Sequence, residues 1–319
     1  MLIVVYIFLA FLSTTPVYAQ YDGRTTNGEL AFRALYMSFP DVIAEVAFTD
    51  GDWTITTRNG QTFFWAGGRI LPVSAMNNAD SYGFYSFYAV PAQAASPSAF
   101  PPRYIETLRT RGNSEARQER SEMNRTFQGI LYGGLERQEI EARLERIDFL
   151  GRRVTVHQRI VDALRRIEAE IRAWDGGEAF IASLNSADGY SWRSIAGTQR
   201  MSYHSWGLAV DIQPRRLGTL AIYWLWERGR NDDWMLVPLE RRWNPPNQVI
   251  AAFEKEGFIW GGKWPMYDNM HFEYRPELHA FTRLMADNPL AAGRDLHHVY
   301  PAGIMPPTHG RQSSNLRVD

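Results

Sequence analysis

Two short segments bring together the residue types that hold a divalent metal in proteins. In RMSYHSWGLAVDI, residues 200–212, His204 and Asp211 lie on either side of Gly207. In NMHFEYR, residues 269–275, His271 is a third candidate ligand. The chain has no cysteine, so any metal must be held by His, Asp or Glu.

The first segment has the alternation of a half-buried strand. One face carries the apolar side chains of Leu208, Val210 and Ile212. The other face carries Asp211, which is costly to bury unless that face opens onto a cleft or a cation. Gly207 lets the backbone turn sharply enough for the His204 imidazole to approach the Asp211 carboxylate.

The second segment places His271 and Glu273 on one strand face and the apolar Phe272 on the other. If this strand runs antiparallel to the first, His271 and Asp211 point into the same cleft. Three protein ligands with a fourth position left for water are typical of a catalytic zinc site, whereas a structural site is closed by a fourth protein ligand. The spacing therefore predicts a zinc site at which chemistry takes place.

These segments resemble the M15 metallopeptidases, which cut the stem peptides of bacterial peptidoglycan. The S-x-H-x-x-G-x-A-x-D motif of that family occurs here as Ser202, His204, Gly207, Ala209 and Asp211. Its second element, an acidic residue three positions before a histidine, occurs as Asp268 and His271. The resemblance covers about residues 147–285, and the flanking WRSIAGTQR and WGGKWPMYDNMHFEY are similar to the carboxypeptidase-like branch.

The resemblance implies that His204, Asp211 and His271 hold Zn²⁺ and that Asp268 is the general base. Strand alternation alone favours Glu273 as the base, since it shares a face with His271. We prefer Asp268, because a residue in the turn before the strand can reach over the metal, and Glu273 is then a neighbour of the ligands or a solvated charge.

The resemblance also implies that Arg193 binds a substrate carbonyl or carboxylate and stabilises the oxyanion. The alternative for Arg193 is an exposed arginine at a strand end. We expect Ser202 to hydrogen-bond within its turn or to substrate. Trp264 either lines a peptide groove or belongs to the core.

Several elements must position these residues. WTITTRNGQTFFWAGG, residues 53–68, predicts a hairpin around Asn59-Gly60, and the Pro-rich residues 89–104 predict an extended linker. Residues 103–174 predict helices, the last over residues 153–173 with His157 as a core histidine on its apolar stripe. Residues 190–275 predict strands, and a final helix is expected from Pro276. The sequence thus predicts an α+β fold: a central antiparallel sheet with flanking helices carries the zinc site, after an N-terminal mixed accessory region.

The chain ends carry their own signals. MLIVVYIFLAFLSTTPVYAQ predicts a signal peptide cleaved after Ala19 and export to the periplasm, the cell envelope or the medium. No Lys or Arg precedes its apolar run, so an uncleaved membrane anchor stays open. We predict a signal peptide over residues 1–19, an accessory region over 20–145, an M15-like zinc peptidase domain over 146–285 and a flexible tail over 286–319.

Composition and motifs together define the predicted function. At 319 residues and a net charge of −1, the chain has no overall basic field to attract nucleic acid. We predict a zinc peptidase of peptidoglycan stem peptides that is similar to D-alanyl-D-alanine carboxypeptidases. The alternatives are an L-alanyl-D-glutamate endopeptidase, a non-catalytic zinc module that binds cell wall, and an envelope scaffold whose His and Asp residues form only a polar core network.

Overall fold

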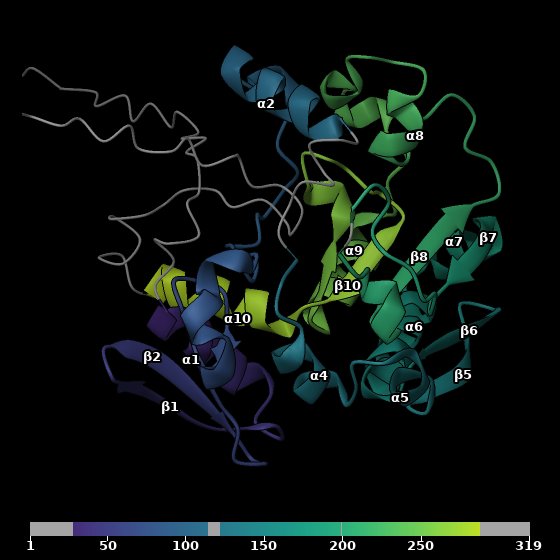
Figure 1. Cartoon of the computed structure of the whole chain (residues 1–319). Coiled ribbons are helices and arrows are strands. Elements are labelled where there is room, and N and C mark those ends of the chain that lie inside the picture. Colours follow the sequence, from purple (N-terminus) through teal and green to yellow (C-terminus); the bar gives the residue numbers. More distant parts are fainter. Residues whose placement is uncertain (1–27, 114–121, 199, 288–319) are drawn as a thin grey trace, which may run out of the picture.

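The computed structural model describes residues 28–113, 122–198 and 200–287. These residues form a mixed α+β fold with antiparallel sheets (Figure 1). Residues 1–19, the predicted signal peptide, lie outside the described residues, as do positions 288–319 of the predicted tail. Within the described ranges, no helix combines the length and the apolar character that a membrane crossing requires.

An antiparallel four-stranded sheet positions the two motif segments. Its strand order is β7-β8-β10-β9, with both motif strands in the middle. As predicted, β8 and β10 are antiparallel, and His271 lies directly opposite Asp211. The bounds are β7 Leu184–Asp188, β8 Ala209–Pro214, β9 Phe258–Trp260 and β10 His271–Tyr274.

Helices cover the apolar face of this sheet. Val210 and Phe272 are fully buried there, and Phe253 stacks on Phe272 with ring centroids 3.9 Å apart. The helices concerned are α6 Val161–Ala173, α7 Gly177–Ser183 and α9 Asn247–Lys255. Because side chains alternate along a strand, burial of this face leaves the other face for Asp211 and His271.

The helix predicted over residues 153–173 is wrong in its first part. Residues 144–157 form a hairpin of β5 Leu144–Phe149 and β6 Arg152–His157, and α6 begins only at Val161. Leu150 and Gly151 form the turn, with φ of 50° and 73°. The buried Val154 and Val156 alternate along β6, and their spacing to the next apolar residues happens to fit a helix as well.

His157 ends β6 as a buried core residue. Its Nε2 lies 3.0 Å from the Tyr132 carbonyl oxygen, and its Nδ1 accepts a hydrogen bond from the Arg159 backbone N–H. Burial lowers the pKa of His157 to about 4. The ring is therefore neutral near pH 7.

The strand-rich region predicted over residues 190–275 is confirmed only in part, by β8, β9 and β10. Loops and short helices occupy most of this region between β7, β8, β9 and β10. Its aromatic residues pack as a second, smaller apolar cluster, in which α8 Trp224–Arg228 lies beside α2 Pro102–Gly112 (Figure 1). Aromatic residues are common in strands, and here they are frequent because the loops bury them in this cluster. This explains why the composition of the region indicated strands.

The accessory region begins with α1 Gly28–Ser38 and a second antiparallel sheet, in the order β1-β2-β3-β4. Its strands are β1 Ile43–Thr49, β2 Asp52–Thr57, β3 Thr62–Phe64 and β4 Leu71–Pro72. The hairpin predicted around Asn59-Gly60 is confirmed, since β2 pairs with β3 and Gly60 has a φ of 86°. After α2 come α4 Thr126–Tyr132 and α5 Arg137–Glu141.

Short 3-10 helices occur in several of the connections. Their bounds are Val73–Ser81, Pro97–Ala99, Gln158–Ile160, Tyr203–Trp206, Trp234–Leu236, Leu239–Arg241 and Gly261–Lys263.

The accessory region shares its core with the sheet that carries the site. The final helix α10, Pro276–Asp287, begins at Pro276 as predicted and packs against α1. Phe87 of the accessory region also packs on Phe281 of α10, with ring centroids 5.4 Å apart. One buried cluster runs from α1 through α4 to β8. The predicted boundary at residue 146 lies inside β5 and stays a prediction.

Candidate metal centre and active site

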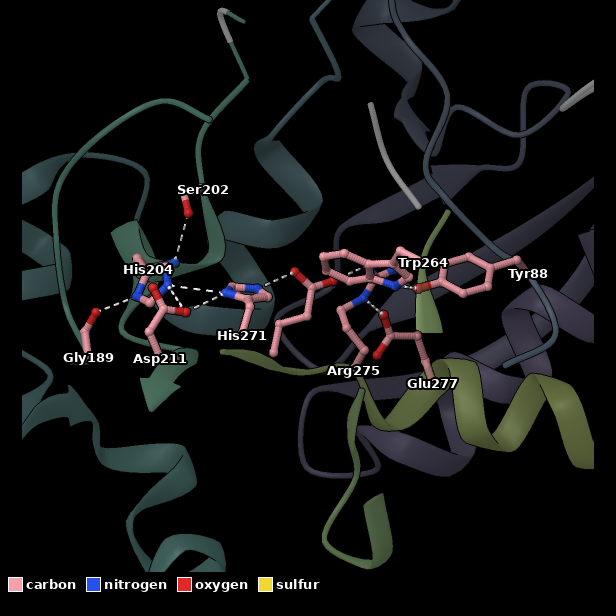
Figure 2. A network of polar contacts seen from close by, with 10 residues as sticks. Tyr88, Gly189, Ser202, His204, Asp211, Trp264, His271, Arg275 and Glu277 are labelled. Atoms are coloured by element: carbon pink, nitrogen blue, oxygen red, sulfur yellow. Dashed lines mark hydrogen bonds and ion pairs between the residues drawn. The ribbon is translucent and has the colours of Figure 1, made fainter. Parts of the chain in front are cut away.

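The three predicted ligands lie together on the open face of the sheet (Figure 2). Oδ1 of Asp211 is 2.9 Å from Nδ1 of His271 and 3.2 Å from Nε2 of His204. The two histidine nitrogens are 3.3 Å apart. Both histidines are buried, and the Asp211 side chain is 13% exposed.

The turn before β8 delivers His204 to the cluster. Ser202 caps the 3-10 helix Tyr203–Trp206, and Gly207 ends it with a φ of 66°. A Cβ at Gly207 would lie 2.7 Å from the backbone nitrogen of His157, so this position also needs the space that glycine leaves. The left-handed turn sends the chain straight into β8, which places Asp211 beside His204.

The outer nitrogen of each histidine has an oxygen partner. Nδ1 of His204 lies 2.5 Å from the Gly189 carbonyl oxygen, and Nε2 of His271 lies 3.2 Å from Oε2 of Glu273. A carbonyl oxygen and a carboxylate accept hydrogen bonds, so each outer nitrogen carries the proton. When a metal is bound, the inner nitrogens of His204 and His271 are then left to present lone pairs to the centre of the cluster.

This donor set fits zinc. Tetrahedral ligands at zinc bond lengths of 2.0–2.1 Å lie about 3.3 Å from one another, and the three distances in the cluster are close to that value. Two inward lone pairs and a carboxylate repel each other unless a cation lies between them. His204, Asp211 and His271 are therefore able to hold a divalent metal and to leave a position open.

The charges of the cluster favour a bound cation. Although burial opposes ionisation of Asp211, the neighbouring His204 and His271 hold the pKa of this carboxyl well below its usual value. Burial also opposes a charge on His271, yet its hydrogen bonds with Asp211 and Glu273 raise the pKa of His271 to about 10. The carboxylates thus stabilise positive charge at the point where a metal would lie.

Asp268 lies in the turn immediately before β10. Its Oδ1 atom is shielded from solvent and has no hydrogen-bond partner. Burial and the nearby charge of Asp211 raise the pKa of Asp268 to about 7. A carboxyl group with this pKa can accept and return a proton near neutral pH, as a general base must.

Glu273, the other candidate base, has both oxygens occupied. Oε2 contacts His271, and Oε1 lies 3.4 Å from Nη1 of the buried Arg275. Despite burial, these partners lower the pKa of Glu273. Glu273 therefore orients His271. Because both oxygens of Glu273 have partners and Oδ1 of Asp268 has none, the arrangement favours Asp268 as the group that transfers the proton.

Arg193 lies in an exposed loop before the Tyr203–Trp206 turn, not at the end of a strand. Its backbone is anchored because Ser205 Oγ accepts from the Arg193 N–H and donates to the Arg193 carbonyl oxygen. The side chain lines the cleft, and its charge acts on Asp268. Arg193 is thus placed to meet a ligand that enters near Asp268.

Ser202 and Trp264 also lie at the site. Ser202 is buried, and its Oγ accepts a hydrogen bond from the His204 N–H. Ser202 therefore stabilises the turn that carries His204. Trp264 is half-buried, its ring centroid is 5.6 Å from that of His271, and it lines the cleft. Trp264 Nε1 donates to the Tyr88 hydroxyl (Figure 2).

A cleft of about 430 Å³ opens over the cluster, and the accessory region forms part of its wall. Tyr85, Met123 and Gln128 line it together with Arg193, Asp268 and His271. Sequence reasoning did not find the accessory contribution, because no local spacing relates these residues to the motif segments.

Comparison with protein families gives two matches. Residues 196–274 match an M15 peptidase family described as D-alanyl-D-alanine carboxypeptidase. Residues 31–87 match a family described as a domain of unknown function. Searches of curated proteins and of solved structures found no match. The M15 match contains His204, Asp211, Asp268 and His271, so the chain carries a peptidase region of the M15 family.

Proposed function

We propose that this protein is an exported zinc peptidase that hydrolyses peptide bonds in peptidoglycan stem peptides, with D-alanyl-D-alanine carboxypeptidase-like action. The observation that carries the proposal is that His204, Asp211 and His271 lie at zinc-ligand spacing in the same cleft as Asp268, whose Oδ1 has no hydrogen-bond partner. The family match supports the peptide substrate.

Each residue has a defined task in this reaction. His204, Asp211 and His271 would hold zinc, whose Lewis acidity would serve to polarise the peptide carbonyl and to lower the pKa of water. Asp268 removes a proton from the attacking water and returns it to the leaving amine. Arg193 donates hydrogen bonds to the carbonyl oxygen as negative charge develops there, or to a substrate carboxylate.

The size and lining of the cleft favour a short peptide, rather than a large polymer, as the group that binds and reacts there. Its volume of about 430 Å³ suits a few residues, and Trp264 offers an aromatic surface beside His271. The cationic Arg193 at this cleft favours a substrate with a free carboxylate. Stem peptides carry such carboxylates, whereas a net charge of −1 gives no reason to propose nucleic acid.

The test is mass spectrometry of purified muropeptides incubated with the zinc-loaded protein. Loss of a single terminal alanine supports the carboxypeptidase reaction. Release of fragments cut between L-alanine and D-glutamate would replace it with the endopeptidase reaction. Unchanged muropeptides with zinc bound would instead support a wall-binding module, and absence of metal binding would leave only a scaffold.

The matched control is Asp268→Asn, which preserves the shape of the side chain but removes its basicity. Products that the wild type forms and Asp268→Asn does not form arise from this site. Products that both preparations form at the same rate do not depend on Asp268, and they would count against its role as the general base.

A further inference from the structure

A buried polar network lies behind His271, on the side away from His204. Figure 2 shows Arg275 and Glu277 there. Glu273 joins them to the histidine, since its Oε2 is 3.2 Å from His271 Nε2 and its Oε1 is 3.4 Å from Arg275 Nη1. Glu273 is 7% exposed, so water does not compete for these contacts.

Arg275 is the centre of this network and is 1% exposed. Its Nε donates to Oε1 of Glu277 at 2.5 Å. Its Nη2 donates to the Ser86 carbonyl oxygen at 2.8 Å. A buried guanidinium is costly unless its donors are satisfied, so these partners fix its position and, through it, the position of Glu273.

The accessory region supplies the far end of the network. The Tyr85 hydroxyl donates to Oε1 of Glu277 at 3.3 Å, and both residues are buried. Oε2 of Glu277 has no partner, so this carboxylate depends on the donors at Oε1. Arg275 also lies over the rings of Tyr85 and Tyr203, 5.6 and 5.0 Å from their centroids.

The same accessory segment reaches His271 by a second path. The Tyr88 hydroxyl accepts from Trp264, whose ring lies beside the His271 ring. Residues 85–88 thus contact both the carboxylate network behind His271 and the aromatic ring next to it. These contacts join positions nearly two hundred residues apart in the chain, as the separation of 192 between Tyr85 and Glu277 shows.

We propose that Tyr85 of the accessory region is a positioning residue for the metal centre, acting on His271 through Glu277, Arg275 and Glu273. The proposal rests on the metal site of the proposed function and assigns a role to the region whose family has no known function. Outer partners of a metal-bound histidine fix its orientation and basicity, and their loss typically weakens metal binding 10-fold to 100-fold.

The test compares Tyr85→Phe with Tyr132→Phe. Tyr132 is a matched control because it is also buried, but its hydroxyl has no partner. Zinc affinity is measured by competition with a chelator. The visible absorption spectrum of the Co²⁺-loaded protein reports the ligand geometry, and circular dichroism verifies folding.

We expect Tyr85→Phe to shift the Co²⁺ spectrum and to weaken zinc binding about 10-fold, while Tyr132→Phe matches the wild type in both. Arg275→Lys should give a larger effect of the same kind. A folded Tyr85→Phe protein with the wild-type spectrum and zinc affinity would overturn the proposal.

These readouts do not depend on hydrolysis. If the wild type binds zinc but leaves muropeptides uncut, the proposed function fails and the positioning role of Tyr85 is still decided by the spectrum. If equal shifts occur in Tyr85→Phe and Tyr132→Phe, the effect is a general loss of packing and the positioning role is refuted.

Discussion

His271 and Asp211 face each other directly across the β8–β10 pair, and their Nδ1 and Oδ1 atoms lie 2.9 Å apart. The same register buries Phe272 opposite Val210 on the other face. A slip of one residue would turn His271 into the core and Phe272 into the cleft. Core packing and metal-site geometry are therefore specified by one strand register.

Replacing a ligand should release the metal. For His204→Ala we expect zinc affinity to fall by more than about 100-fold. Loss of a residue that only hydrogen-bonds a metal ligand typically costs about 10-fold to 100-fold, and loss of the ligand itself should cost more. Metal analysis after dialysis against a weak chelator measures this. His279→Ala is the control, because His279 Nε2 hydrogen-bonds to the Phe258 carbonyl oxygen and His279 is not part of the cluster. Full zinc occupancy in His204→Ala would remove His204 from the ligand set.

Replacing the base should separate binding from catalysis. Asp268→Asn should keep zinc and lower kcat by about 10²-fold to 10⁴-fold, the usual contribution of general acid-base catalysis. Glu273→Gln should instead weaken zinc binding, since Glu273 contacts His271. Steady-state kinetics with a defined stem peptide, together with metal analysis, measure both. If Asp268→Asn stays active and Glu273→Gln loses activity with zinc bound, the base is Glu273.

Arg193 should matter for hydrolysis and little for folding. For Arg193→Met we expect kcat/KM to fall about 10²-fold, as for loss of one oxyanion donor. Unfolding free energy should change by less than about 0.5 kcal/mol, because the side chain is exposed. Arg146→Met, an exposed arginine of β5 outside the cleft, is the control. Equal kinetics in both variants would leave Arg193 without a role in the reaction.

His157 should make the fold sensitive to acid. Its folded pKa is about 4 against 6.5 for the free side chain, so the folded state resists protonation. The associated stability is complete above pH 6.5 and is lost as pH falls towards 4, by up to about 3 kcal/mol.

Denaturant unfolding of chelator-treated protein at pH 7 and pH 4.5 checks this without a contribution from metal release. The wild type should lose more stability between these pH values than His157→Gln does. The same loss in both proteins would show that other groups control the acid response.

Gly207 should be needed for both folding and metal binding. Gly207→Ala combines a positive φ with a Cβ placed 2.7 Å from the His157 nitrogen. Gly218→Ala is the matched control, because it has a φ of 60° but open space around it. We expect about 1 kcal/mol of destabilisation for Gly218→Ala, and a larger loss with weakened zinc binding for Gly207→Ala. Thermal unfolding and zinc titration distinguish the two.

The sequence predicted the site better than it predicted the surrounding elements. Alternation in the two motif segments and the Gly207 turn, together with an assumed antiparallel pairing and the resemblance to M15 peptidases, placed His204, Asp211 and His271 in one site. These are local signals, since each depends on residues within a few positions. The hairpin at Asn59-Gly60 was predicted for the same reason.

The prediction was wrong where the spacing of apolar residues fits both a strand and a helix. The spacing of Val154, His157 and Val161 fits a helix, yet the chain forms β6 and then α6. The Leu150-Gly151 turn is the signal that could have separated them. Contacts such as Tyr85 with Glu277 lie beyond sequence reasoning of this kind, because they depend on tertiary packing between distant segments.

The packing of α1 on α10 has a consequence for how the molecule unfolds. Phe281 and Leu278 of α10 are buried, and α10 follows directly after the strand that carries His271. Peeling the accessory helix away would expose this apolar surface to water and loosen β10 with it. We therefore expect the two regions to unfold together, and a fragment limited to residues 196–274 would lack α10 and the buried contacts that α10 makes.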